Sequence, residues 1–192
     1  MASGKSRIMI TRRTLFSLSL AALASPALAA DHPSITFMNQ VGKDLLHAHR
    51  IGTVAAFQRV IQRYADVHGI AGQSLGQYNV SGGQKGSYER GVAKFIARYF
   101  AEQSHDYPIA KYEVGEATVA DNKDVFVDSK VYMMAGQTYS VTWRLSWIGG
   151  QYKVVDAKFL GFSMVNQQRS LFTSYVGKHN GNVGDLITAL NR

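Results

Sequence analysis

Apolar and polar side chains alternate along the segment TYSVTWRLSW, which runs from Thr138 to Trp147. A period of two predicts a strand with one apolar and one polar face. The apolar face is rich in aromatic rings, and its members are Tyr139, Val141, Trp143, Leu145 and Trp147. Such a face has two interpretations, because large rings can either fill a core or form one wall of a cavity for an apolar ligand.

Three more segments of the second half have the composition of strands. Residues 111–120, 124–134 and 151–160 are rich in Val, Tyr, Phe and Thr, and the separators DNK, AGQ and GG are short and contain turn residues. Gly149 and Gly150 suit a tight hairpin, since glycine adopts positive φ angles without strain. The pattern therefore predicts a four-stranded antiparallel sheet over about 111–160.

The segments on either side of the predicted sheet have helical periodicity. Three helices are predicted within about 34–105: the first is capped by Ser34, the second starts near Thr53 and the third is capped by Ser87. Two more are predicted within about 163–191, the first capped by Ser163. This order predicts an α+β fold in which helices pack on a curved sheet. A sheet that coils around helices encloses a cone-like apolar cavity, a common type of ligand site.

Residues 1–29 have the composition of a secretory signal peptide. An apolar run over 15–24 precedes the small-x-small site Ala27-Leu28-Ala29, and the basic residues before the run are Lys5, Arg7, Arg12 and Arg13. The run is too short to cross about 30 Å of hydrocarbon. The motif TRRTLF resembles a twin-arginine export signal, and the alternative is a general secretory signal with two adjacent arginines. Cleavage near Ala29 would release residues 30–192 outside the cytoplasm.

The charge of the chain disfavours nucleic acid as a partner. The 21 Lys and Arg residues and 13 Asp and Glu residues give a formal net charge of +8. The predicted signal peptide removes four cations and no anion, which leaves 17 cations, 13 anions and a net charge of +4. This excess is spread along the chain without a basic run. The lack of cysteine excludes disulfides, thiolate metal sites and a cysteine nucleophile.

The polar residues form no strong catalytic or metal-binding pattern. His47 and His49 lie two residues apart, so on a helix they point in different directions and cannot share a metal ion. The candidate general bases of a cone-shaped enzyme, such as an isomerase or a dehydratase, are Asp66, Glu116 and Asp156. Asp156 interrupts the alternation of its strand, and its alternative role is a salt bridge or a cap at the edge of the sheet. We expect no catalytic residue, no metal site and no cofactor.

Residues 151–190 resemble the C-terminal part of the MlaC-type periplasmic phospholipid carriers, also called toluene-tolerance auxiliary proteins of ABC transporters. The matching positions are Val155-Asp156, Gly161-Phe162-Ser163, Arg169, Phe172 and Gly184-Asp185-Leu186-Ile187. An earlier segment is also similar, at Phe57, Asp66, Ile70, Ala71 and Leu75-Gly76. The chain departs from the family pattern at Ala65, where the family has Phe, and at Tyr78, where it has Trp. The order and spacing agree over about residues 36–190.

The resemblance implies an NTF2-like sheet with a helical lobe and a periplasmic carrier that is not an enzyme. Such a carrier holds phospholipid acyl chains inside the protein. It moves the lipid between an inner-membrane ABC transporter with an MCE domain and an outer-membrane lipoprotein complex. A related branch of the family is associated with hopanoid synthesis, so a hopanoid-like lipid is the alternative cargo.

Combined with the residue pattern, the resemblance predicts a monomer whose cavity contacts the acyl chains. The predicted contacts are Phe57, Phe95, Tyr99, Tyr139, Val141, Trp143, Leu145 and Phe159. For each of them, a place in a filled core is the alternative. Arg169 is expected to pair with Asp156 or with a backbone carbonyl rather than with a headgroup.

Overall fold

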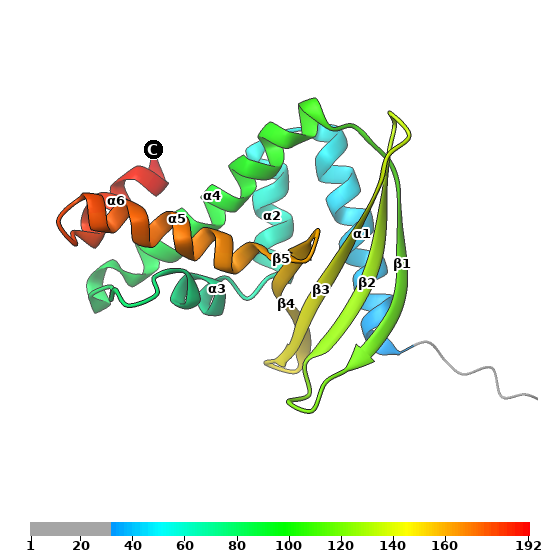
Figure 1. Ribbon diagram of the computed structural model, residues 1–192, viewed down its shortest axis with the longest axis horizontal. Coiled ribbons are helices and arrows are strands. Elements are labelled where there is room, and N and C mark those ends of the chain that lie inside the picture. Colours follow the sequence, from blue (N-terminus) through cyan, green and yellow to red (C-terminus); the bar gives the residue numbers. More distant parts are fainter. Residues whose placement is uncertain (1–31) are drawn as a thin grey trace, which may run out of the picture. The chain divides into compact units, whose positions relative to one another are not determined.

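The computed structural model describes residues 32–192, so the predicted signal peptide lies outside the described residues. The first helices are α1 (Pro33–Ile51), α2 (Val54–Tyr64), α3 (Val67–Ser74), the 3₁₀ turn η1 (Gly82–Gln84) and α4 (Lys85–Asp106). The strands are β1 (Ile109–Val119), β2 (Val125–Met133), β3 (Thr138–Ile148), β4 (Gln151–Phe159) and β5 (Phe162–Ser163). The chain closes with α5 (Met164–Lys178) and α6 (Val183–Asn191). The predicted α+β fold is confirmed (Figure 1).

The strands form one open antiparallel sheet in the order β1-β2-β3-β4-β5. The hairpin between β3 and β4 turns at Gly149 and Gly150, with φ angles of 59° and 81°, as the sequence predicts. The predicted number of four strands is too low by one. The fifth strand has only two residues, Phe162 and Ser163, and a segment of that length cannot show a period of two.

Helix α1 covers the half of the sheet that contains β1 and β2. Met38 and Val41 of α1 are buried against Val125, Val127 and Leu145 in one core cluster. The approach of α1 to the sheet is close because α1 has a glycine, residue 42, where it meets the ring of Tyr112 from β1. This half of the sheet is therefore a filled core.

The other helices pack mainly on one another rather than on the sheet. Helix α4 lies chiefly against α2, through Ala93, Ala97 and Ala101, which recur every four residues. A separate core cluster joins α3, α4, α5 and α6 around Phe172, which is 1% exposed. In Figure 1, α5 runs from β5 away from the sheet. Within residues 32–192 no helix has the length and apolar character needed to span a membrane.

Of the three predicted helix caps, Ser163 is confirmed, and the predicted helix start near Thr53 is confirmed as well. The side chains of Thr53 and Ser163 accept hydrogen bonds from the backbone at the starts of α2 and α5. The other two predicted caps were wrong. Helix α1 begins one residue before Ser34, because Pro33 is already suited to the first helical position. Helix α4 begins two residues before Ser87, because η1 leads directly into it.

The contact between α1 and β1 predicts opposite effects for two glycine-to-alanine substitutions. In Gly42→Ala the new Cβ would lie 2.0 Å from Cε1 of Tyr112, so we expect a loss of about 1–3 kcal/mol of unfolding free energy. Gly72 in α3 has open space around it. Gly72→Ala should therefore raise the unfolding free energy by roughly 0.5–1 kcal/mol. Urea denaturation measures both, and a Gly42→Ala variant as stable as the wild type would contradict the close contact.

Candidate functional site

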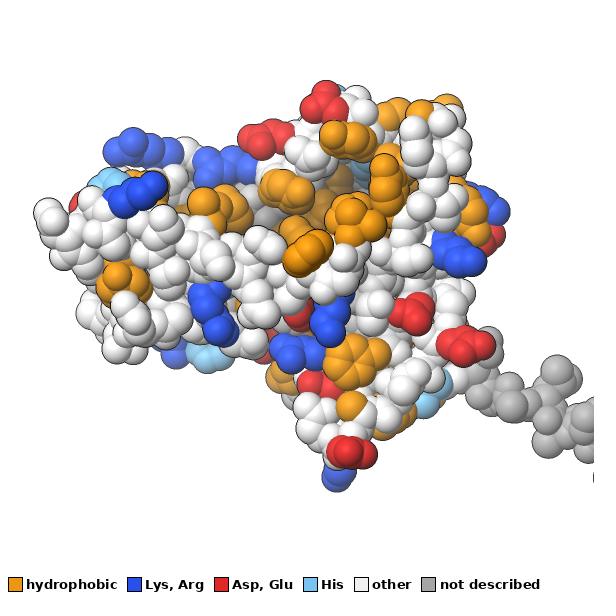
Figure 2. Space-filling view, in the orientation of Figure 1, with side chains coloured by type: hydrophobic (Ala, Val, Ile, Leu, Met, Phe, Trp, Pro, Cys, Tyr) orange, Lys and Arg blue, Asp and Glu red, His pale blue; other side chains and the backbone are white. Residues whose placement is uncertain are grey.

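A cavity of about 570 Å³ lies between the β3–β4 half of the sheet and helices α2, α4 and α5, and α1 and α3 also contribute to its lining, through Val41, Leu45 and Ile70. This volume is within the usual range for ligand pockets, about 300–1,000 Å³. Its walls are almost entirely apolar. In Figure 2 apolar side chains gather around a recess on this face of the molecule.

The composition of α4 explains why a cavity remains. Small side chains of α4, including Ala97, face α2 and allow the two helices to pack closely. The large side chains on a different face of α4 line the cavity, and these are Phe95, Ile96, Tyr99 and Phe100. Spacings of three and four residues place them along one stripe of the helix. On the opposite side the sheet contributes Trp143, Val154, Ala157 and Phe159.

Half of the predicted lipid contacts line this cavity. Phe95 and Tyr99 do so from α4, Trp143 from β3 and Phe159 from β4. Tyr99 and Phe159 are also partly open to solvent, with exposed fractions of 44% and 38%, so they lie at the mouth. Trp143 is deeper, and its indole N–H donates to the hydroxyl oxygen of Ser129 at 2.9 Å.

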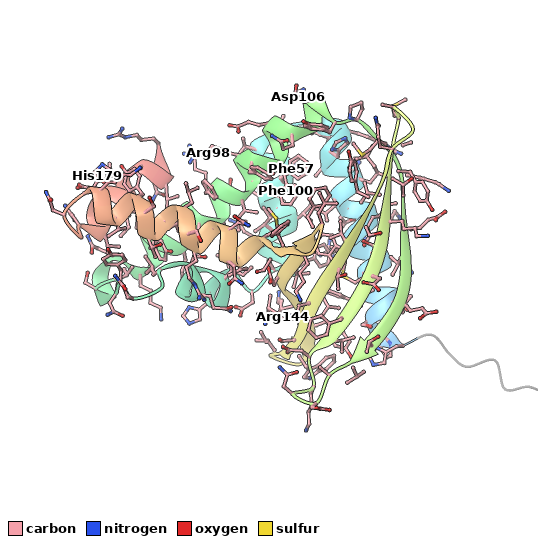
Figure 3. All side chains as sticks on the ribbon, viewed as in Figure 1. Phe57, Arg98, Phe100, Asp106, Arg144 and His179 are labelled. Atoms are coloured by element: carbon pink, nitrogen blue, oxygen red, sulfur yellow. The ribbon has the colours of Figure 1, made fainter. Side chains whose placement is uncertain are left out.

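The other four predicted contacts lie outside the cavity lining. Leu145 is fully buried in the core beneath α1. Phe57 is 2% exposed, and its ring stacks on that of Phe100, which lines the cavity while Phe57 does not. Both residues are labelled in Figure 3. Tyr139 and Val141 lie further along β3. A role for these residues in binding a lipid stays a prediction.

Sequence reasoning missed the contributions of α2 and α5 to the cavity. Helix α2 supplies Val60, Ile61 and Tyr64, and the segment around the start of α5 supplies Phe162, Met164 and Leu171. The sequence of α5 does contain a pattern that indicates its place beside the cavity. Val165, Phe172 and Val176 are buried and form one apolar stripe, whereas Met164 and Leu171 form a second stripe seven residues apart. A helix with two apolar stripes covers two apolar surfaces, and here the second surface is the cavity.

Asp156 has the bonding of a helix cap. One residue of β4, Val155, is an extra residue opposite the Arg144–Leu145 step of β3, and this bulge places Asp156 opposite Arg144. The carboxylate is 7% exposed, and its Oδ1 accepts from the backbone N–H groups of Ala157 at 2.8 Å and Val165 at 3.1 Å. Asp156 thus ties β4 to the first turn of α5.

Three further polar side chains on the helices around the cavity have hydrogen-bond partners within the protein. Gln168 is 8% exposed and donates from Nε2 to the Ser74 hydroxyl at 2.6 Å. Arg169 donates from Nε to the carbonyl of Gln73 at 2.7 Å, one of its two expected pairings. Asp66 caps α3 by accepting from the N–H of Gly69 at 3.1 Å. These bonds hold the helices together and leave an apolar interior.

His49 has a structural role at the contact between α1 and β1. Nε2 of His49 accepts from the backbone N–H of Ile109 at 3.1 Å. Burial lowers the pKa of His49, and the nearby Arg50 and His105 lower it further. This favours the neutral ring that the hydrogen bond requires. Across the part of the chain that the structure describes, His, Asp and Glu side chains form no group of three able to hold a metal ion.

Comparisons with known proteins agree with this geometry. A sequence model of the MlaC protein family matches residues 39–192. A search of curated proteins finds no match. Among solved structures, a phospholipid-binding protein from Ralstonia solanacearum in complex with a phospholipid is similar, with a TM-score of 0.67 and 19% sequence identity. The similarity covers 84% of this chain and 96% of that chain, and it shows a shared fold.

The capping role of Asp156 predicts that its removal destabilises the fold. Asp156→Ala leaves two backbone N–H groups without an acceptor, and one of them is buried, so we expect the unfolding free energy to fall by about 2–3 kcal/mol. Ser163→Ala removes only a side-chain cap from the same helix and should cost about 1 kcal/mol. Thermal or urea unfolding compares the two. Equal stability of Asp156→Ala and wild type would contradict the capping role.

Proposed function

This chain belongs to the MlaC family, and we propose that it is a phospholipid carrier that shelters acyl chains in the cavity. The observation that carries the proposal is the cavity itself, which is about 570 Å³ in volume and lined by aromatic and aliphatic side chains. Support also comes from the similar Ralstonia solanacearum protein, which was solved with a phospholipid.

The physical requirement for such a carrier is an apolar surface that replaces water around the acyl chains. Each CH₂ group that leaves water contributes about 0.8 kcal/mol, so binding needs area rather than directed polar contacts. The cavity offers this area, since its polar groups at Gln168 and Asp156 already have partners within the protein. The headgroup would remain at the mouth, beside Tyr99 and Phe159, where the lining is open to solvent.

A carrier must also release its cargo, so its cavity has to change shape at low cost. Met164 is suited to this because its unbranched thioether side chain adapts to irregular space. Leu171 and Phe162 at the mouth are 54% and 64% exposed and are therefore little constrained by neighbours. We infer that these residues rearrange when a lipid enters or leaves.

The wider role follows from the family. We propose that residues 1–29 direct export and that residues 30–192 act in the periplasm as a single, monomeric lipid-binding domain. In this role the chain carries phospholipid between an inner-membrane ABC transporter with an MCE domain and an outer-membrane lipoprotein complex. Hydrogen bonds already occupy Asp66 and Asp156, which supports a carrier without catalytic activity.

Filling the cavity should abolish lipid binding while preserving the fold. Ala157 lines the cavity from β4, and Ala157→Phe places a ring in the space that the acyl chains would occupy. Ala110 is exposed on β1 away from the cavity, so Ala110→Phe is the matched control. Native mass spectrometry of the mature chain, followed by lipid extraction, measures the bound lipid.

We expect about one diacyl phospholipid per chain in the wild type and in Ala110→Phe, and at least a tenfold reduction in Ala157→Phe. A hopanoid in the extract would assign the chain to the other branch of the family. A wild-type protein that stays free of lipid after incubation with vesicles would contradict the proposal.

The two tryptophans of the chain provide an independent test by fluorescence. Trp143 lines the cavity, whereas Trp147 is 62% exposed and packs against Tyr152. In Trp147→Phe, added phospholipid should shift the emission of Trp143, because the indole gains apolar neighbours. In Trp143→Phe the emission of Trp147 should stay constant. A shift in the emission of Trp147 without a shift in that of Trp143 would indicate that the lipid binds outside the cavity.

A further inference from the structure

The hairpin between β4 and β5 presents apolar side chains to solvent. Its sequence is Phe159-Leu160-Gly161-Phe162, and Phe159 pairs with Phe162 across the turn. Phe159 is 38% exposed, and Leu160 and Phe162 are each 64% exposed. All three also line the mouth of the cavity. The hairpin is therefore a protruding apolar edge of the candidate site.

The backbone of this turn is unfavourable for leucine. Leu160 and Gly161 have φ angles of +50° and +83°, so both central residues of the two-residue turn are in the left-handed region. Such turns favour Asn-Gly, because asparagine and glycine tolerate positive φ, whereas a bulky side chain is strained there. Leu160 also gains little from burial in the fold. Its presence costs stability in both respects, which is typical of a residue that acts on something outside the folded chain.

The apolar edge continues onto the two neighbouring helices. Tyr99 of α4 is 44% exposed and Leu171 of α5 is 54% exposed, and both line the cavity. We call the exposed residues Tyr99, Phe159, Leu160, Phe162 and Leu171 the mouth rim. A contiguous exposed apolar surface around an opening marks an interaction site more often than isolated apolar residues do.

Cations lie beside the mouth rim. Lys158 directly precedes Phe159 and is exposed. Arg98, which precedes Tyr99 on α4 (Figure 3), donates instead to the carbonyls of Leu190 and Arg192 at the end of α6. Arg169 of α5 is exposed and is held by its hydrogen bond to the carbonyl of Gln73. The acidic neighbour within one turn of the rim residues on α4 and α5 is Glu102. Asp156, two residues before Lys158, is buried and its carboxylate is already bonded within the protein. The exposed cations Lys158 and Arg169 therefore make the surroundings of the rim complementary to an anionic surface.

We propose that the mouth rim docks onto the surface of a bilayer that contains anionic phospholipid. Leu160 and Phe162 enter the boundary between headgroups and acyl chains, and Lys158 and Arg169 face the phosphates. The inference rests on the proposed function of the cavity, since docking in this orientation lets an acyl chain pass from the bilayer into the cavity without crossing water. It adds the bilayer itself as a partner of the rim.

The strain at Leu160 allows a test that separates docking from folding. Leu160→Asn removes the apolar side chain and supplies a residue that the turn favours, so the melting temperature should stay the same or rise. Met134 is the matched control, because it is 71% exposed at the β2–β3 connection and does not line the cavity. Flotation with vesicles of phosphatidylcholine, with and without phosphatidylglycerol, measures docking of the wild type, Leu160→Asn and Met134→Asn.

The expected result is binding of the wild type to vesicles that contain phosphatidylglycerol, weakened by salt. Leu160→Asn should bind about tenfold more weakly, in line with the loss of one buried leucine side chain. Met134→Asn should bind as the wild type does. The proposal would be overturned if the wild type bound neither kind of vesicle. It would also be overturned if Leu160→Asn bound vesicles as well as the wild type does. Self-association through the rim in place of vesicle binding would overturn it too.

Native mass spectrometry of the same samples keeps this test separate from that of the cavity. Weak vesicle binding by a folded Leu160→Asn variant would support docking by the rim whether or not its lipid content also falls, because Leu160 lines the mouth of the cavity as well. A chain that carries lipid but does not bind vesicles would overturn docking and leave the carrier function standing. A chain that carries no lipid yet binds vesicles through Leu160 would support docking and contradict the function of the cavity.

Discussion

The apolar inner face of the sheet must be shielded from water, and the helices meet it closely over only one half. Over β1 and β2, Gly42 brings α1 into direct contact with the sheet, and the result is a filled core. Over β3 and β4 the facing helix is α4, which its alanines hold against α2. The space between α4 and the sheet is then bounded by large side chains from both sides but is not filled by them. The cavity is thus a consequence of where α4 packs.

The position of the cavity mouth depends on how α5 is joined to the sheet. The bulge at Val155 places Asp156 where its carboxylate binds the first turn of α5, and Ser163 caps the same helix. The two-residue strand β5 and the turn at Leu160 lie between these points. The polar groups at this junction therefore serve the fold, and the apolar residues of the hairpin are left at the opening.

The sequence was sufficient to predict the local elements because their patterns depend on near neighbours. The alternation around Trp143 and the glycines at 149–150 predicted strands and their turn correctly. The helix start near Thr53 and the cap at Ser163 were also predicted correctly. A strand of two residues has no pattern to detect. The helix starts near Ser34 and Ser87 were misplaced because Pro33 and η1 determine the backbone there.

The candidate site was harder to predict than the fold, for a physical reason. Trp143 and Leu145 lie on the same face of β3, two residues apart, and the sequence pattern treats them alike. One lines the cavity and the other is buried beneath α1, because the difference depends on which helix covers each position. The position of a covering helix depends on packing between distant segments, so periodicity within one strand cannot supply it.

The central claim is that acyl chains occupy the space between α4 and the β3–β4 half of the sheet. The most direct measurement is photo-cross-linking with a phospholipid that carries a diazirine at the end of one acyl chain, followed by mass spectrometric mapping. Labels on Phe95, Trp143 and Ala157, which line the cavity, are the predicted result. Labels confined to the outer face of the sheet or to the groove around Tyr78 and Thr173 would contradict the claim.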